Sequence, residues 1–321
     1  PVGTGPFKVD AMAANRWRLS AHAGSWRPPQ VDKLELLVLP DASSRVQALE
    51  AGRVDVALVI GPDNIEALEA AGARVETFIT ATTFAITLRT TAGGPLADVR
   101  VRKALNHAIN RERIVASLLA GRTVPSGQPG TRGVFGHDPE LAPYPYDLAR
   151  AKALLAEAGY SGGFAFTLDA ATSSTAADAS VFQQVQADLR EVGVTMTINT
   201  MPYPLFLSKT VRTEFEGDAF PISWAAWPTL DTLRAMEMHS CLRLVPWFCD
   251  PALVPVMKQA LAERDEARAL ALRRQVARAL HDQATGLLLY ELPVFVGLSP
   301  QVRDFTMVGY RIFYDRIALA P

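Results

Sequence analysis

The stretch from Pro95 to Gly121 constrains the fold of this chain more than any other part of the sequence. Asp98 is a good N-cap for a helix. The apolar residues after it recur at the spacing that places them on one helix face, and these are Val101, Ala104, Leu105, Ala108 and Ile109. Asn110 can cap a second helix, with Glu112 in the first turn, where the helix dipole favours an anion, before Gly121 ends the pattern. The stretch therefore predicts two consecutive helices that meet at Asn110.

The segments around this stretch alternate between strand-like and helix-like patterns. Strands are predicted at 17–20, 34–39, 54–60, 75–79, 84–88, 164–168, 194–198 and 286–297, and a further strand begins at 218. Helices are predicted to end at Gly52 and to cover 64–71, 148–158, 177–192 and 265–284, with one more capped by Asp250 and started by Pro251. The run at 54–60 is almost continuously apolar, as in a strand that is buried on both faces. This alternation predicts an α/β fold built from βαβ units.

Length and charge disfavour several classes of protein. The chain has 321 residues, of which 49% are hydrophobic and 20% charged, and this is enough for two domains with a large core. A net charge of -1 without blocks of like charge gives no reason to expect nucleic acid or an anionic membrane as a partner. No apolar run approaches the roughly 18 to 20 residues that a membrane-spanning helix needs, so we expect no membrane insertion of this segment.

Sequence motifs for catalysis and for metal or cofactor binding are absent. There is no G-x-S-x-G, H-E-x-x-H, C-x-x-C or Walker motif. The histidines are scattered without ligand spacing, and they are His22, His107, His137, His239 and His281. We therefore expect no catalytic residue, no metal site and no cofactor. A hydrolase triad assembled from distant residues stays formally open, because such triads are defined by geometry rather than by sequence order.

Several segments, in order along the chain, resemble those of family 5 solute-binding proteins of ABC transporters, the dipeptide, oligopeptide and nickel receptors. One segment is the core of the two predicted helices, VRKALNHAINRERIV. The others are GTGPFKV at 3–9, LEAGRVDVA at 49–57, YD at 146–147 leading to AKALLAEAGY at 151–160, and LREVGV at 189–194. Their number and their order together make the resemblance specific.

The resemblance implies a two-lobed α/β fold of the periplasmic-binding-protein type, in which the lobes enclose a ligand. We expect a first-lobe segment at 1–92, a second, large ligand-binding lobe at 93–292, and a return to the first lobe at 293–321. In the resembled family, GTGPFKV lies well inside the chain, so we expect a C-terminal fragment without a signal sequence and without the N-terminal part of the first lobe. The implied protein is a periplasmic monomer that delivers a peptide-like solute to an ABC permease with a separate ATPase subunit.

Cys241 and Cys249 flank the short loop LRLVPWF. In an oxidising compartment, such as the periplasm that the resemblance implies, two cysteines at close spacing favour a disulfide bond. In the cytosol the same pair would more often be free thiols or half of a metal site. We therefore expect a disulfide between Cys241 and Cys249.

The segment SWAAWPTLD at 223–231 gives the sharpest indication of a ligand. Peptide receptors of the resembled family have a similar segment, in which an aspartate three positions after a tryptophan binds the ammonium group of the peptide. Here Trp227 occupies the position three after Trp224. An indole has no negative charge, although its face can hold a cation or stack on a planar group. The candidate substrate-binding residues are Trp224, Trp227 and Asp231, with Tyr203 and Trp247 as further aromatic candidates, and a helix cap is the favoured role of Asp231.

Alternative interpretations remain open from the sequence. A nickel-chelate or other non-peptide receptor of the same family is suggested by His239, although one histidine makes a weak metal site. An extracytoplasmic hydrolase and a chemoreceptor subunit are the alternatives from other classes. The segment 122–143 is rich in glycine and proline and has no period, so it either contacts the ligand or only packs on the surface.

Overall fold

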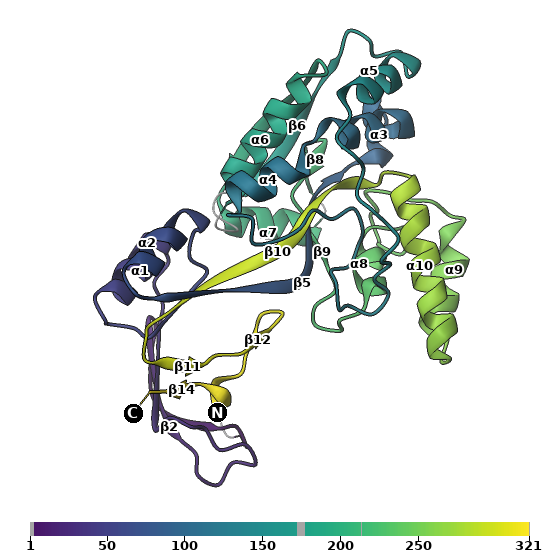
Figure 1. Ribbon diagram of the computed structural model, residues 1–321. Coiled ribbons are helices and arrows are strands. Elements are labelled where there is room, and N and C mark those ends of the chain that lie inside the picture. Colours follow the sequence, from purple (N-terminus) through teal and green to yellow (C-terminus); the bar gives the residue numbers. More distant parts are fainter. Residues whose placement is uncertain (1–2, 172–176, 213, 321) are drawn as a thin grey trace. The chain divides into compact units, whose positions relative to one another are not determined.

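The computed structural model describes residues 3–171, 177–212 and 214–320, and Figure 1 traces the chain. The chain divides into two compact units. Unit 1 consists of residues 1–78 and 293–321, and unit 2 consists of residues 79–292. Each unit has hydrophobic clusters of its own.

The α-helices cover much of the sequence that was predicted to be helical. They are α1 (Ala42–Glu50), α2 (Ile65–Ala70), α3 (Val99–Ala108), α4 (Arg111–Leu118), α5 (Leu148–Glu157), α6 (Asp178–Arg190), α7 (Tyr203–Arg212), α8 (Thr232–Met238), α9 (Leu253–Ala262) and α10 (Glu266–Asp282). Side-chain caps predicted from the sequence are present at Asp98 of α3, Asn110 of α4 and Asp147 of α5. The five apolar residues of the first predicted stripe are fully buried. The two helices that meet at Asn110 are confirmed.

The strands are shorter or longer than the sequence patterns indicated. They are β1 (Phe7–Ala13), β2 (Arg16–Ala21), β3 (Lys33–Leu37), β4 (Val56–Leu58), β5 (Arg74–Leu88), β6 (Phe164–Ala171), β7 (Val194–Met201), β8 (Ala219–Phe220), β9 (Trp224–Ala225), β10 (Gly286–Leu298), β11 (Val302–Asp304), β12 (Met307–Val308), β13 (Arg311–Ile312) and β14 (Ala318–Leu319). Short 3₁₀ turns lie at Pro62–Asn64, Thr90–Ala92, Pro95–Ala97 and Tyr314–Arg316.

Unit 1 contains three small groups of paired strands. β1, β2 and β3 form an antiparallel sheet in that order, and β11 pairs with β14 and β12 with β13. The end of β10 pairs antiparallel with β4. α1, α2 and this part of β10 share a cluster that includes Leu49, Leu68 and Phe295. The core of unit 1 therefore forms from apolar residues that are far apart in sequence.

β4 differs from its prediction. Only Val56–Leu58 forms the strand, and Ala57 is buried while its two neighbours are half-buried. Val59 has a φ of 52°, a left-handed conformation that ends the extended run, and Ile60 then turns into the core. The prediction of a strand buried on both faces is therefore wrong, because the apolar run is divided between a short strand and the turn after it.

Unit 2 is built around β6 and β7, which are parallel and joined by α6. β8 pairs with both β5 and β6, so the strand order is β5, β8, β6, β7. The largest cluster of the unit joins this sheet to α3, α4, α5 and α6. A second cluster packs α8, α9 and α10 against Trp224 and Leu288. The predicted βαβ unit at 164–198 is confirmed.

β5 is one continuous strand where the sequence indicated two. Together with β10 it carries the chain from one unit to the other, since residues 78/79 lie inside β5 and residues 292/293 inside β10. The boundary between the two compact units therefore falls inside strands and not in a loop. The limits at 92/93 and 292/293, expected for the two lobes that enclose a ligand, stay a prediction.

α9 begins later than predicted. Its first residue is Leu253, after an N-cap at Ala252, rather than Pro251. The carboxylate of Asp250 accepts a hydrogen bond from the backbone N of Ala252 at 3.0 Å, which closes a turn before the helix. Asp250 therefore stabilises the approach to α9 and does not cap the helix itself.

Candidate functional site

β9 and the residues after it are held against the part of β5 that lies in unit 2. The two strands pair antiparallel, with Trp224 opposite Thr83. The backbone N of Ala226 donates a hydrogen bond to the carbonyl of Ala81 at 2.8 Å, and the Ala226 side chain is fully buried. The backbone that carries the candidate tryptophans is therefore fixed by sheet pairing and not by a free loop.

Trp224 lies inside unit 2 in a stack of rings. It stacks on His239 with ring centroids 4.0 Å apart and 6° between the planes. The His239 ring is 5.6 Å from that of Trp247, and the Arg243 guanidinium lies 4.0 Å from the Trp247 ring centroid. Trp224 is 1% exposed, and His239 and Trp247 are each 2% exposed. These surroundings favour a packing role for the two tryptophans, and their contact with a solute stays a prediction.

Burial keeps the centre of this stack neutral. Desolvation is the main cause that lowers the pKa of His239 to about 3, and the nearby charge of Arg243 lowers it further. Burial also lowers the pKa of the Arg243 guanidinium. Nδ1 of His239 lies 3.4 Å from the hydroxyl of Thr87. The imidazole is therefore an uncharged spacer between two indole rings.

The cavity beside Trp224 is too small for a solute. Its volume is about 10 Å³, and its walls include Asn106, Tyr144 and Leu288. One water molecule needs about this much space. The cavity that Trp224 lines within unit 2 therefore cannot hold a ligand.

Asp231 is held by two interactions within unit 2. Its Oδ1 accepts a hydrogen bond from the backbone N of Leu233 at 2.9 Å, which caps α8. The guanidinium of Arg273 donates to both carboxylate oxygens, at 2.8 and 2.7 Å. The predicted helix cap is present, and the bidentate pair with Arg273 adds a second structural role.

Trp227 and Tyr203 are the aromatic candidates that are not buried. Trp227 is half-buried and precedes Pro228 through a cis peptide bond. Tyr203 is 48% exposed in the first turn of α7. Within the described residues, neither ring joins the stack around His239. The binding role of both residues stays a prediction.

The segment 122–143 packs closely on the rest of unit 2. The hydroxyl of Thr83 donates to the carbonyl of Gln128, and the Gln128 amide donates to the carbonyl of Asp138, at 2.9 and 2.8 Å. The backbone N of Phe135 donates to the carbonyl of Leu230 at 2.9 Å. The segment therefore supports the turn after Trp227, whereas direct contact with a ligand stays a prediction.

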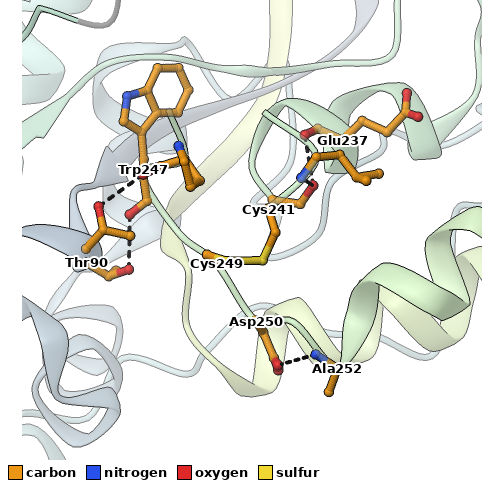
Figure 2. The surroundings of a disulfide bond; sticks show 11 residues. Thr90, Glu237, Cys241, Trp247, Cys249, Asp250 and Ala252 are labelled. Atoms are coloured by element: carbon orange, nitrogen blue, oxygen red, sulfur yellow. Dashed lines mark hydrogen bonds between the residues drawn. A yellow bond between two sulfur atoms is a disulfide. The ribbon is translucent and has the colours of Figure 1, made fainter. Parts of the chain in front are cut away.

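Cys241 and Cys249 form the predicted disulfide bond, with Cα atoms 4.5 Å apart. Figure 2 shows the loop that the bond closes. The carbonyl of Trp247 accepts hydrogen bonds from the backbone N and the hydroxyl of Thr90, at 2.8 and 3.0 Å. The loop that carries Arg243 and Trp247 is therefore held both by the disulfide and by Thr90.

The partners of these candidate residues were not predicted from the sequence. The sequence does contain a sign that Arg273 is buried. It falls within the apolar stripe of α10, together with Ala269, Val276, Ala277 and Leu280. A basic residue at a buried position requires a hydrogen-bonding or charged partner. Nothing in the local pattern indicates that Arg243 covers Trp247, since that contact depends on how the disulfide loop closes.

A sequence model described as bacterial extracellular solute-binding proteins, family 5 Middle, matches residues 1–240. The chain belongs to this family. Among curated family 5 relatives, the dipeptide-binding protein of Escherichia coli (strain K12) is 28% identical across 96% of this chain. Heme-binding protein A of Haemophilus influenzae is 26% identical across 98% of the chain. The match covers 59% of each relative, so the chain spans less than two thirds of their length.

Solved structures of family 5 proteins share the fold. NikA from Brucella suis in complex with Fe(III)-EDTA is 25% identical with a TM-score of 0.85, and the match covers 99% of this chain and 68% of that chain. The structure of HbpA2 from Haemophilus parasuis is 25% identical with a TM-score of 0.81, over 100% of this chain and 65% of that chain. The predicted α/β binding-protein fold is therefore confirmed.

Membrane-spanning helices and clusters of metal-binding side chains are both absent from the residues that the structure describes. None of the helices in 3–171, 177–212 and 214–320 is long and apolar enough to cross a membrane. In the same ranges, no three His, Cys, Asp or Glu side chains gather where they could hold a metal ion.

Proposed function

We propose that this chain belongs to the substrate-binding component of an ABC transporter, which captures a peptide or peptide-like solute outside the cytoplasmic membrane for import. Membership of family 5 is the observation that carries this proposal. The relative named as a dipeptide-binding protein supports the peptide class of cargo. The partner is then an ABC permease with a separate ATPase subunit, and the binding component acts as a periplasmic monomer. Its role is binding and not catalysis.

The proposed cargo lacks a free ammonium group at the end that meets Trp227. Asp231 is already bonded to Arg273 and to the backbone of α8. Trp227 stands where the resembling peptide receptors keep an aspartate, and an indole cannot neutralise a cation in the way a carboxylate does. Burying an unpaired ammonium group costs several kcal/mol. We therefore propose a solute that is blocked, neutral or planar at this end, or a diffuse cation that rests on the indole face.

Copurification is the most direct test of the solute class. The protein is purified from its source organism under native conditions, and the small molecules released on denaturation are identified by mass spectrometry. A peptide or peptide-like compound is the expected result. A turnover assay with the identified compound then tests the hydrolase alternative, because a binding component returns the compound unchanged.

A matched pair of dipeptides tests the role of Trp227. The free dipeptide and its N-acetylated form are titrated by calorimetry into the wild type and into a Trp227→Asp variant. The acetylated form is expected to bind the wild type at least as tightly as the free form, and the variant is expected to gain affinity for the free amine only. Clearly tighter binding of the free amine by the wild type would show that the assignment of Trp227 is wrong.

A non-peptide solute is the second candidate. The relative named as a heme-binding protein and the NikA structure in complex with Fe(III)-EDTA show that family 5 proteins similar to this chain bind such compounds. His239 suggested a nickel chelate from the sequence, but it is 2% exposed and stacked on Trp224. The support for a non-peptide solute is therefore the aromatic character of Trp227 and not His239. Haem or a metal chelate in the copurification experiment would favour this candidate over a peptide.

A further inference from the structure

Trp227 lies in a turn whose backbone is held at both ends. We name residues 226–230 the Trp227 turn. The carbonyl of Ala226 accepts hydrogen bonds from the backbone N of Leu230 at 2.9 Å and from the hydroxyl of Thr229 at 3.1 Å. Leu230 has a φ of 56°, a left-handed conformation that residues other than glycine rarely adopt. Such a conformation persists only where surrounding contacts hold it, so the turn depends on its neighbours in the fold.

The segment 130–136 supplies one of these supports. The backbone N of Phe135 donates to the carbonyl of Leu230, and the backbone N of Thr232 donates to the carbonyl of Phe135, both at 2.9 Å. Phe135 thereby forms a parallel bridge with Asp231. The end of the Trp227 turn is therefore bonded to a segment that is far away in sequence.

Two glycines show how closely this segment approaches the start of α8. A Cβ atom at Gly130 would overlap Cγ2 of Thr232, and one at Gly136 would overlap its Oγ1. Gly136 also has a φ of 95°, which favours glycine. No space is left between the segment and α8, so the support is rigid.

Arg273 of α10 contacts both partners of the bridge. Its guanidinium binds both carboxylate oxygens of Asp231, and its central carbon lies 4.8 Å from the centroid of the Phe135 ring. The same guanidinium donates to the carbonyls of Ala260 and Ala269, at 3.1 and 3.0 Å. One buried side chain thus joins α9 and α10 to the bridge that ends the Trp227 turn.

This combination of contacts requires an arginine. A guanidinium is planar, presents N–H donors in a rigid fork that matches a carboxylate, and can lie against an aromatic ring while those donors are in use. The ammonium group of a lysine is a point charge with three donors and lacks the fork. A lysine at position 273 would keep the charge and lose the geometry.

We propose that Arg273 is a positioning residue of the solute site, because it holds Asp231 and Phe135 together and so fixes where the Trp227 turn places its indole. The consequence for binding rests on the proposed function, in which Trp227 meets the solute. A turn that is ordered before binding loses less conformational freedom when the solute arrives. Loss of the Arg273 contacts would therefore weaken binding without removing any group that touches the solute.

Fluorine NMR of the chain labelled with 5-fluorotryptophan tests the position of the indole without any solute. The chain has five tryptophans, and replacing each with phenylalanine in turn assigns the signals. In Arg273→Lys, the Trp227 signal is expected to shift and broaden. The Trp224 signal is expected to stay in place, because that residue is held by pairing of β9 with β5 and by its stack on His239.

A second variant and a matched control accompany this measurement. Phe135→Leu removes the ring beside the guanidinium and keeps the backbone bonds, so a smaller change of the Trp227 signal is expected. Arg102→Lys is the control, since Arg102 is also buried in unit 2 and donates to the carbonyls of Gln283 and Ala284 beyond the end of α10. It is expected to lower stability and to leave the Trp227 signal unchanged.

Calorimetry with an N-acetylated dipeptide measures the consequence for binding. Arg273→Lys is expected to lose about tenfold in affinity, and Arg102→Lys is expected to bind as the wild type does. If the wild type does not bind this peptide, the proposed cargo is wrong, and the NMR comparison still decides the role of Arg273.

The proposal is overturned if the Trp227 signal of Arg273→Lys matches that of the wild type. It is also overturned if Arg273→Lys and Arg102→Lys change the Trp224 and Trp227 signals alike, since Arg273 would then support unit 2 as a whole. A changed signal with unchanged affinity for the bound peptide would equally overturn it. If Arg273→Lys does not fold, the Phe135→Leu variant decides by the same comparison.

Discussion

Two structural demands meet at Asp231, which caps α8 and neutralises Arg273. The Arg273 side chain is 9% exposed and also donates to the carbonyls of Ala260 and Ala269. The guanidinium is therefore held in place by three elements and cannot turn to solvent without breaking these bonds. The acidic residue after Trp227 therefore has a structural role, because both of its carboxylate oxygens are used in these contacts.

Asp231→Ala is expected to lower the free energy of unfolding by about 3 kcal/mol, because it leaves a buried guanidinium charge unpaired and removes a helix cap. Urea unfolding followed by circular dichroism measures the change. Asp265→Ala is the matched control, since Asp265 caps α10 through the backbone N of Arg268 and is exposed. Its expected loss is about 1 kcal/mol. Equal losses in the two variants would contradict the role given to Arg273.

His239 makes stability depend on pH. Its pKa is about 3 in the folded chain, chiefly because of burial, against an ordinary value of 6.5. When the pH falls from 6.5 towards 3, the unfolded chain binds a proton that the folded chain does not, so unfolding becomes easier. The stabilisation is complete above pH 6.5 and is lost on acidification.

Replacing His239 with phenylalanine keeps a ring next to Trp224 and removes the titration. Between pH 7.5 and pH 5, the wild type is expected to lose about 2 kcal/mol more unfolding free energy than His239→Phe does. Urea unfolding of both proteins at the two pH values gives the difference, in which other titrating groups cancel. Parallel losses would show that the imidazole is protonated in the folded chain at pH 5.

Residue roles can be predicted from the sequence where the interacting groups are neighbours in the chain. Asp98 and Asn110 cap helices whose first turns follow directly in the chain. The surroundings of Trp224 could not be read in this way, because its stacking partner His239 comes from the far end of α8. The candidate residues were therefore named from the sequence, but whether each is buried or accessible depends on tertiary packing.

The disulfide loop, residues 241–249, carries the Trp247 ring of the stack around His239. Residues 241–249 contain no helix or strand, and the loop is held by the Cys241–Cys249 bond and by the contacts of Thr90 and Thr91 with the Trp247 and Pro246 carbonyls. Without the bond, the unfolded chain regains the conformational freedom of this loop. The disulfide therefore acts mainly on the unfolded state.

Reduction of the disulfide is expected to lower the free energy of unfolding by about 2 to 3 kcal/mol, which is the chain-entropy estimate for a loop of this length. Urea unfolding with and without reductant measures the difference. A Cys241→Ser/Cys249→Ser variant serves as the control and is expected to be insensitive to reductant. Two titratable thiols in the unfolded, unreduced chain would contradict the bond itself.

The spacing of apolar residues predicts a helix or strand most accurately when one face of that element is buried along its whole length. The stripe of α3 is continuous, and both helices around Asn110 have the expected positions. The run at 54–60 differs from its prediction because apolar residues in a turn and in a strand look alike in sequence. The sequence indicates two strands instead of β5 because the threonines and alanine at 80–83 interrupt its apolar pattern, although all four residues are buried.

At the scale of the whole molecule, the hydrophobic clusters follow the two units. The large cluster of unit 2 and the one around Trp224 use residues of 79–292 only. In unit 1, Phe295 packs with Ile65 and Leu68, and Phe305 packs on Phe78 with ring centroids 5.5 Å apart. Unit 1 is therefore complete only when 1–78 and 293–321 are both present, whereas unit 2 is one uninterrupted stretch of chain.

Residues 79–292 expressed alone are therefore expected to fold. Their clusters are complete, so the free energy gained by burying apolar surface does not depend on 1–78 or 293–321. A far-ultraviolet circular dichroism spectrum with helical bands and a single cooperative urea transition are the expected results. Residues 1–78 alone are the matched control, and without Phe295 and Phe305 they are expected to show no cooperative transition. If 79–292 unfolds without cooperativity while the whole chain is cooperative, the core of unit 2 depends on unit 1, and the division of the molecule at residues 78/79 and 292/293 does not describe how it is stabilised.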